Sequence, residues 1–285
     1  MTIHILGIDA AWTAQQPSGV ALLGARKNAK PELLALGRSY EEFLAAGLHR
    51  QSDWRNRVHG SPPAINALLA HCRKLSGALP RIIALDIPLS PQPLAGRRMC
   101  DNAVTSAYVS RGAGTHTPTA RRPGPLAYAL FQQLCAAGYH WHTHGVLPRQ
   151  KRVFLETYPH PAIIELMQLP RRLAYKTSRR AQYWPEASPA LRWRRLCRNL
   201  EALRDALAGE IKGVTSLVPA ATAVRRRGGA VLLKGLEDML DAVVCAWVGY
   251  QFWRGCARAY GNAEAAIWIP VPDFRSKKLV KPSKN

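Results

Sequence analysis

The feature that most limits the fold is a series of short apolar runs, several of which end at a carboxylate. Residues 3–8 form the first run and lead directly into Asp9, and residues 19–23 and 33–37 follow it after polar turns. Apolar runs of this length, bounded by turn residues, are typical of β-strands. The beginning of the chain therefore predicts an antiparallel β-meander.

Predicted strands and helices alternate after the meander. Apolar runs predict strands at residues 81–86 and 152–158, and a shorter one at residues 267–270 that we expect at an edge of the sheet. Apolar faces at helical spacing predict helices at residues 64–75, 125–137, 189–210 and 236–253. This order of elements is typical of an α/β fold, here a mixed five-stranded sheet flanked by helices, with inserted loops and helices.

Length and composition fit a single domain. The chain has 285 residues, of which 47% are hydrophobic, and this is enough for one sizeable core. We expect the domain to cover residues 1–275, and residues 276–285 to form a basic, disordered tail. Within the domain, residues 90–124 are rich in Pro, Gly and Arg, so we expect an extended loop there with at most a short helix.

Nothing in the sequence indicates export or membrane insertion. No apolar run reaches the roughly 18 residues that a transmembrane helix needs, and the N-terminal residues lack the basic start of a signal peptide. The six cysteines include no C-x-x-C pair, so neither a zinc ribbon nor a disulfide scaffold is expected. We therefore expect a cytoplasmic protein with reduced thiols and no membrane partner. Its oligomeric state stays open.

The charge balance indicates a polyanionic partner. Lys and Arg number 40 against 18 Asp and Glu, a formal net charge of +22. Such a chain attracts nucleic acid, because binding releases condensed counterions. An arginine-rich composition without any such partner is the alternative interpretation. The candidate nucleic-acid contacts are Arg97, Arg98, Lys176, Arg225, Arg226 and Arg227. The candidates for stacking on bases are Trp12, Tyr108, Trp184 and Trp193.

Five carboxylates occupy positions that are unusual for acidic side chains. Asp9 and Asp86 follow predicted strands, and Glu156 lies within one. Asp238 and Asp241 lie three residues apart on an apolar helix, so both face the same side. A turn or a helix cap is the alternative role for each of them. Buried carboxylates without partners are costly, and a bound cation removes that cost.

These five candidate catalytic residues predict a divalent-metal site. Hard oxygen ligands with few His or Cys residues nearby suit Mg²⁺ or Mn²⁺. Two such ions, roughly 4 Å apart, activate water and stabilise the leaving oxygen in phosphodiester cleavage. The carboxylates and the net charge thus indicate the same substrate, nucleic acid.

Several short motifs carry a resemblance to a known family. In order along the chain they are Gly7-Ile-Asp-Ala-Ala11 with Ser18-Gly19, Ala84-Leu-Asp-Ile-Pro-Leu89, Arg97-Arg-Met-Cys-Asp101, Glu156-Thr-Tyr-Pro-His160, Tyr175-Lys176 and Asp238-Met-Leu-Asp-Ala242. Together they resemble the domain of unknown function 429 family, described as predicted nucleases with an RNase H-like fold. The resemblance implies that residues 1–275 form a single RNase H-like domain.

The resemblance also implies roles for the carboxylates. The wider RNase H-like superfamily, which includes Holliday-junction resolvases, has one aspartate on the first strand, a carboxylate after the fourth strand and one or two acids on a late helix. By resemblance these roles fall on Asp9, Asp86, and Asp238 or Asp241. We favour Asp241 as the third metal ligand because it borders a wholly apolar run, whereas Asp238 lies nearer the helix start, where the dipole favours it. Glu156 is extra to that pattern and belongs to the narrower family.

The leading interpretation is a metal-dependent nuclease that hydrolyses phosphodiester bonds of DNA or RNA with two Mg²⁺ or Mn²⁺ ions. One alternative is an actin-like ATPase or phosphotransferase. Against it, Ala10-Ala11-Trp12 follows Asp9 where a Gly-Thr pair is expected to cradle phosphate. Another is a non-catalytic nucleic-acid-binding module, against which the full set of carboxylates argues. The sequence leaves open whether the substrate is DNA or RNA, single-stranded, duplex or branched.

Overall fold

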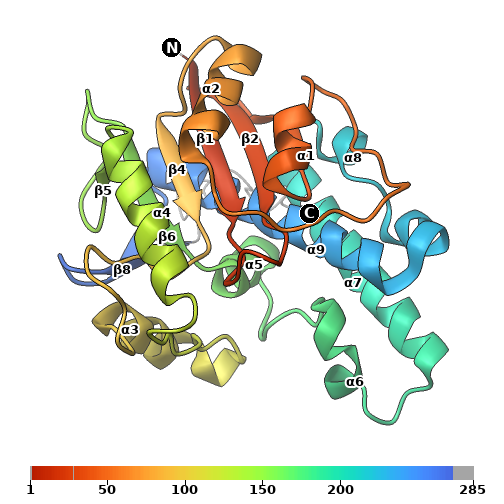
Figure 1. The fold of residues 1–285 in the computed structure, drawn as a ribbon. Coiled ribbons are helices and arrows are strands. Elements are labelled where there is room, and N and C mark those ends of the chain that lie inside the picture. Colours follow the sequence, from red (N-terminus) through yellow and green to blue (C-terminus); the bar gives the residue numbers. More distant parts are fainter. Residues whose placement is uncertain (1, 28, 272–285) are drawn as a thin grey trace, which may run out of the picture.

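The predicted meander opens the chain in a computed structural model that describes residues 2–27 and 29–271 (Figure 1). Its strands are β1 (Thr2–Asp9), β2 (Gly19–Arg26) and β3 (Glu32–Gly37). Each strand is antiparallel to the next, and Asp9 lies opposite Gly19 in the register of β1 and β2. The meander is therefore confirmed. The predicted tail at residues 276–285 lies outside the described residues.

The other strands of the sheet are β4 (Ile82–Leu85), β5 (His140–Trp141), β6 (Val153–Thr157), β7 (Ala257–Gly261) and β8 (Ala266–Pro270). Across the described residues they make one eight-stranded mixed sheet with the order β3-β2-β1-β4-β6-β8-β7, and β5 also pairs with β6. Strand β4 is parallel to β1, β6 to β4, and β8 to β6. The carboxyl ends of these four strands therefore meet at one edge of the sheet.

The sheet is larger than the five strands predicted. Arg258 and Gly261 interrupt the apolar residues of 257–261, and His140–Trp141 is too short for a periodicity, so neither forms a recognisable apolar run. Both take strand conformation because they pair with β8 and β6. The prediction that residues 267–270 form an edge strand is wrong, because β7 pairs with β8 on its outer side. The mixed sheet flanked by helices is confirmed.

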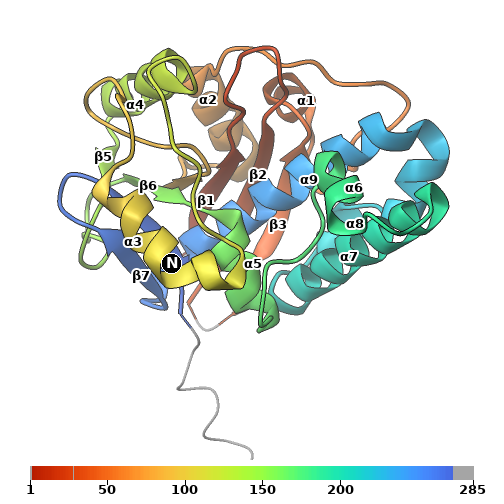
Figure 2. The same cartoon turned by 90° about the horizontal axis from the view of Figure 1, so that it is seen from below.

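Helices cover both faces of the sheet. They are α1 (Tyr40–Ala45), α2 (Ile65–Ser76), α3 (Met99–Tyr108), η1 (Val109–Arg111), α4 (Gly124–Ala136), α5 (Pro159–Met167), η2 (Thr177–Arg179), α6 (Arg180–Tyr183), α7 (Pro189–Glu210), α8 (Val214–Leu217) and α9 (Ala221–Trp253). Figure 2 shows α1, α2 and α4 on one face and α5, α7 and α9 on the other. Side chains alternate along β1 accordingly: Ile3 and Ile5 pack on the α9 side, and Leu6 and Ile8 on the opposite side. None of the helices in the described residues is long and apolar enough to cross a bilayer.

The four predicted helices are present, and the described residues contain further helices that were not predicted, among them α3 and α5. Helix α3 lies within residues 90–124, where an extended loop with at most a short helix was expected, and it has 10 residues. Its first turn is held by Asp101, whose carboxylate accepts a hydrogen bond from the Arg98 backbone N–H at 2.8 Å. Helix α5 begins at Pro159, a residue that suits the first turn of a helix. Helix α9 is longer than predicted and changes direction at Gly228–Gly229, where the backbone angles are not helical.

Two glycines let α9 pack directly on the meander. A Cβ atom on Gly7 would overlap the carbonyl oxygen of Ala242, and one on Gly19 would overlap the carbonyl oxygen of Asp238. A side chain at either position would push the helix away from the sheet. Because Gly19 pairs with Asp9, this close approach brings the carboxyl end of β1 beside the acidic part of α9.

Candidate functional site

The carboxyl ends of β1 and β4 bring two of the predicted carboxylates together. The Asp86 backbone N–H donates to the Ile8 carbonyl oxygen at 2.9 Å, so Asp86 continues the parallel pairing beyond β4. Asp9 and Asp86 are therefore neighbours on adjacent strands. They are spaced by an even number of residues from Ile5 and Ala84, which face α9, so both aspartates lie on the α9 side of the sheet.

Helix α9 adds Asp238 and Asp241 to the same place. Asp241 is fully buried and Asp238 is 3% exposed, and both carboxylates act electrostatically on Asp9. One turn further along the helix, Cys245 accepts a hydrogen bond from the Thr157 hydroxyl at 3.3 Å, which ties α9 to the end of β6. The structure thus brings four of the five predicted carboxylates together.

Lys176 and its neighbour Tyr175 hold Asp241. The Tyr175 hydroxyl donates to Oδ1 of Asp241 at 2.7 Å, and the Lys176 ammonium donates to Oδ2 at 2.5 Å. The same ammonium lies 3.2 Å from Oε1 of Glu237. Lys176 was predicted to contact nucleic acid, and its side chain instead lies among the carboxylates, 19% exposed.

A second lysine balances the other acidic residues of α9. The Lys234 ammonium forms ion pairs with Asp238 and with Glu237, the latter at 3.1 Å. The backbone N–H of Thr177 also donates to Glu237, at 2.7 Å. Glu237 is therefore satisfied by three donors, and it links α9 to the segment that carries Lys176.

The pKa values of these groups follow from burial and from their neighbours. Burial raises the pKa of Asp9 well above its usual range, and Asp241 and Asp238 raise it further. Burial also raises the pKa of Asp86 to about 8, although Lys176 opposes the shift. The pKa of Asp238 is raised to about 6 by burial, with Lys234 opposing. The charged forms of these aspartates are thus disfavoured unless further positive charge is present.

Glu237 behaves in the opposite way. Burial alone would raise its pKa, but Lys176, Lys234 and the Thr177 backbone N–H lower it to about 2. Lys176 therefore mainly neutralises Glu237 and Asp241, and Lys234 mainly neutralises Glu237 and Asp238. Asp9 and Asp86 have no cationic side chain as a direct partner in the described residues.

The donor chemistry of this site fits a divalent cation. Four aspartates and Glu237 face two lysines, which leaves an excess of buried carboxylates, and carboxylate oxygens are the ligands of Mg²⁺ and Mn²⁺. Within the described residues, however, no three of these carboxylates have oxygens within 4.8 Å of one another. Joint ligation of one ion therefore requires the side chains to move closer together.

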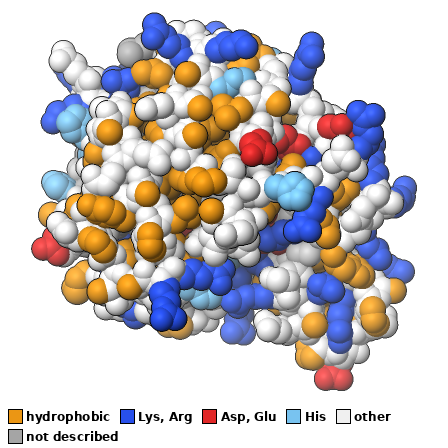
Figure 3. Space-filling model, in the orientation of Figure 1, with side chains coloured by type: hydrophobic (Ala, Val, Ile, Leu, Met, Phe, Trp, Pro, Cys, Tyr) orange, Lys and Arg blue, Asp and Glu red, His pale blue; other side chains and the backbone are white. Residues whose placement is uncertain are grey.

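A cleft of about 920 Å³ opens over the carboxylates. Its acidic lining comes from Asp9, Asp86, Glu237 and Asp238. Its basic lining comes from Arg38, Arg57, Arg122, Arg172, Lys176, Arg179, Arg180 and Lys234. Figure 3 shows further Lys and Arg side chains along the lower and right margins of the molecule, over α6, α7 and the start of α9. An acidic floor with basic walls suits a phosphate chain bound together with cations.

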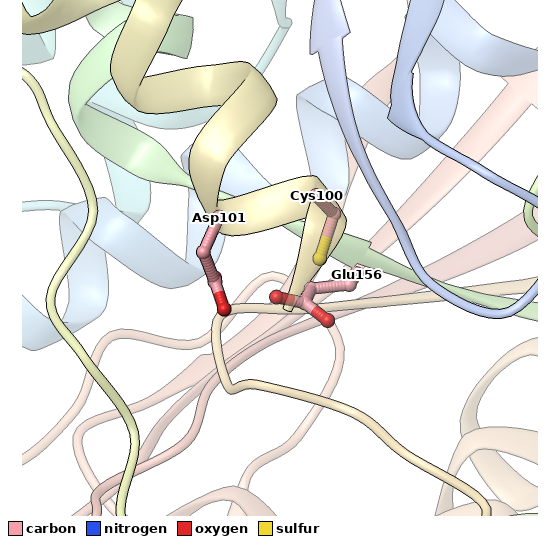
Figure 4. A group of neighbouring side chains, drawn as sticks. All are labelled: Cys100, Asp101 and Glu156. Atoms are coloured by element: carbon pink, nitrogen blue, oxygen red, sulfur yellow. The ribbon is translucent and has the colours of Figure 1, made fainter. Parts of the chain in front are cut away.

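Glu156 does not join the four aspartates. Side chains alternate along β6, and Glu156 points away from α9 toward α3 (Figure 4). There Arg98 donates to its two carboxylate oxygens at 2.6 and 2.7 Å and to Asp101 at 2.9 Å. Cys100, Asp101 and Glu156 offer three potential ligand atoms within 4.8 Å of one another. The Arg98 guanidinium already supplies positive charge to both carboxylates, so this group acts as an ion-pair core between α3 and β6.

The other predicted nucleic-acid contacts lie outside the carboxylate site. Arg98 is 10% exposed in the ion-pair core. Arg97 is exposed, and its guanidinium is hydrogen-bonded to residues 101–117, where it ties α3 to the loop that follows. Arg225–Arg227 are exposed near the start of α9 and do not line the cleft.

The predicted stacking residues differ in their access to the cleft. Tyr108 is buried. Arginine side chains cover Trp184 and Trp193, with guanidinium carbons 6.0 and 4.3 Å from the ring centroids. Trp12 lines the cleft, where its ring makes an edge contact with His116. Trp12 is therefore the residue of the four with access to a ligand above the carboxylates.

Sequence reasoning missed Lys234 and Glu237 as parts of the site. A signal for both was present, since Glu237 directly precedes Asp238 and Lys234 lies one helical turn before it. It also missed Arg172 and Arg179 in the wall of the cleft. These two lie in a segment without periodicity, so only the fold reveals which surface they face.

A model of the family described as "Protein of unknown function (DUF429)" matches residues 7–265 of the chain. The match spans most of the sequence, and the chain belongs to this family. Neither a curated protein nor a solved structure matches it.

Proposed function

We propose that this protein is a metal-dependent nuclease that hydrolyses phosphodiester bonds of DNA or RNA. The observation that carries the proposal is the convergence of four aspartates from two strand ends and one helix under a cleft with basic walls: Asp9, Asp86 and Asp238 line its floor, and Asp241 is buried beneath it. Carboxylates from distant parts of a chain are costly to bury together. Their convergence beneath a basic cleft therefore favours a function that needs divalent cations and a phosphate chain.

We further propose that the fold is RNase H-like. The sheet begins with an antiparallel meander, Asp9 ends its first strand, Asp86 directly follows its fourth, and Asp241 lies on the last helix. This order agrees with the positions that the RNase H-like superfamily uses for its metal ligands. The additional strands β7 and β8 extend the sheet beyond that arrangement.

In this proposal Asp9, Asp86 and Asp241 hold Mg²⁺ or Mn²⁺, with Asp238 beside them. Bound there, the ions supply Lewis acidity toward water and toward the phosphate oxygens. The protein contributes the orientation of the carboxylates. The Tyr175 hydroxyl fixes one oxygen of Asp241 at 2.7 Å, and the basic walls of the cleft hold the negatively charged backbone of the substrate.

The test is cleavage of single-stranded, duplex and branched DNA and RNA by the purified protein, with Mn²⁺, with Mg²⁺ and with a chelator. We expect metal-dependent cleavage that Asp9→Asn abolishes. Asp205→Asn is the matched control, because Asp205 is 68% exposed on α7. Mn²⁺ should also raise the melting temperature of the wild type, since a ligand bound by the native state stabilises it.

Three results would contradict the proposal. Binding of nucleic acid without cleavage under any metal condition indicates a non-catalytic binding module. Hydrolysis of ATP with no action on nucleic acid indicates the actin-like alternative. Cleavage that persists in Asp9→Asn, or with the chelator present, excludes the carboxylate mechanism.

A further inference from the structure

His160 is a buried histidine with an unsatisfied ring nitrogen in the part of the chain that the structure describes. It lies in the first turn of α5, it is 6% exposed, and it lines the cleft beside the carboxylates. Its Nδ1 atom is buried without a hydrogen-bond partner in the described residues. The ring makes edge contacts with Tyr158 and Tyr175. Buried polar atoms are rarely left unsatisfied, so this ring is placed to meet a ligand.

Two arginines beside His160 are also unpaired. Arg172 and Arg179 line the same cleft, and within the described residues neither guanidinium has a hydrogen-bond acceptor or a carboxylate partner. The Nε atom of Arg172 is buried without a partner. Some other arginines that point into the fold have carboxylate partners: Arg38, for example, pairs with Glu42. Arg172 and Arg179 therefore present unused donors and uncompensated positive charge.

The strongest electrostatic neighbours of His160 and of the nearby His116 are cationic. The pKa of His160 is lowered well below its usual value, first by burial and then by Arg172, Lys176, His116 and Arg179. Burial, Arg179, Arg172 and Lys176 likewise lower the pKa of His116, which also lines the cleft. A neutral histidine surrounded by cations is an environment that an anion stabilises.

We propose that His160, Arg172 and Arg179 form a phosphate-binding subsite for the nucleic-acid backbone, next to the aspartates. A phosphate group offers several acceptor oxygens, and an arginine fork donates to two of them at once. The imidazole N–H donates to a further oxygen. Arg180 and Val231 also line this cleft of about 920 Å³, which is larger than a single phosphate group, so the subsite takes an internal phosphodiester of a longer chain. The identity of this ligand rests on the proposed function, whereas the anion site itself does not.

The experiment follows the ring nitrogens of His160 by NMR in protein labelled with ¹⁵N at its nine histidines. The His160 signal is assigned by its loss in His160→Gln. Inorganic phosphate is then added at constant ionic strength, followed by an oligonucleotide without terminal phosphates. The background is Asp9→Asn, which prevents cleavage and leaves the three subsite residues in place.

We expect a saturable shift of the His160 signal with both probes. Arg172→Gln and Arg179→Gln should each weaken the response about tenfold or more, because each removes charge-assisted hydrogen bonds. Arg149→Gln is the matched control: Arg149 is exposed and precedes β6, at the end of the sheet opposite the cleft. It should leave the response unchanged.

The proposal is overturned if the His160 signal does not respond to either probe, or if Arg149→Gln weakens the response as much as Arg172→Gln. A response to inorganic phosphate but not to the oligonucleotide without terminal phosphates overturns the internal phosphodiester in favour of a chain end. Failure of the nuclease proposal is distinguishable from failure of the phosphate subsite. It would leave the response to inorganic phosphate intact while metal-dependent cleavage of the wild type is absent.

Discussion

The ammonium group of Lys176 lies 2.5 Å from Oδ2 of Asp241, beneath the cleft. Burial by itself would lower the pKa of Lys176, but Asp241, Tyr175 and Glu237 raise it well above its usual range. The lysine therefore stays protonated and provides positive charge to buried carboxylates. A divalent ion at this site would take over part of that role.

Lys176→Met should destabilise the metal-free protein by about 3–5 kcal/mol, because it leaves Asp241 and Glu237 buried with one cation fewer. Mn²⁺ should restore part of that stability, so the rise in melting temperature on adding Mn²⁺ should be larger than in the wild type. Differential scanning fluorimetry measures both. Lys74→Met, at an exposed position of α2, is the control. An equal Mn²⁺ response in Lys176→Met and wild type would show that lysine and metal do not share a role.

Asp241 and Asp238 should differ in their importance. Asp241 is fully buried and is held by Tyr175 and Lys176, whereas Asp238 pairs with the half-exposed Lys234. Asp241→Asn should reduce cleavage by more than the roughly 10- to 100-fold that the loss of an outer partner costs, and Asp238→Asn should stay within that range. Rates with Mn²⁺ are compared after both variants are shown to be folded. A dead Asp238→Asn beside an active Asp241→Asn would reverse the assignment.

Glu156 should be important for stability and not for metal binding. Glu156→Gln removes the charge that Arg98 contacts at 2.6 Å, and breaking a buried ion pair costs about 3–5 kcal/mol. Urea unfolding should show the loss, while the Mn²⁺-induced rise in melting temperature remains. Glu186→Gln, at an exposed position, should change neither quantity. Normal stability combined with a lost Mn²⁺ response would instead assign Glu156 to the metal site.

His160 should make the protein less stable in acid. Its pKa is lowered in the folded protein by burial and by neighbouring cations, from an ordinary value of 6.5. Above about pH 6.5 this shift does not change the stability, and as the pH falls below 6.5 it lowers the stability, because the unfolded chain takes up the proton first. This residue alone should contribute up to about 1.4 kcal/mol per pH unit to the fall. Urea unfolding across this pH range should show a shallower decline for His160→Gln than for the wild type or for the exposed His59→Gln. If the free energy of unfolding falls equally with pH in the wild type and in His160→Gln, the lowered pKa of His160 is refuted.

Gly19 should be intolerant of any side chain. The Cβ atom of Gly19→Ala would overlap the Asp238 carbonyl oxygen of α9, and overpacking of this kind costs about 1–3 kcal/mol. Since α9 carries two of the aspartates, the response to Mn²⁺ should weaken as well. Gly96→Ala adds a Cβ in open space and serves as the control. If Gly19→Ala is as stable as Gly96→Ala, the close approach of α9 does not position the site.

The sequence by itself determined the elements that carry the aspartates. Apolar runs that end at Asp9 and Asp86, and the three-residue spacing of Asp238 and Asp241, are local patterns, and local periodicity depends on residues that are neighbours in the chain. For that reason the meander, the strand ends and the acidic face of α9 were predicted. The parallel order of β1 and β4 then brings the two strand-end aspartates together.

Only the tertiary structure decided which groups become partners. Lys176 reaches Asp241 from 65 residues away, and no local pattern distinguishes it from a solvent-exposed lysine. Glu156 lies on a predicted strand, but the strand pattern does not say which face α9 covers, so its position opposite the aspartates emerged only from packing. The same holds for β7, which becomes a strand by pairing with β8. Such contacts depend on the free energy of the whole packed chain, whereas the elements themselves are encoded within a few neighbouring residues.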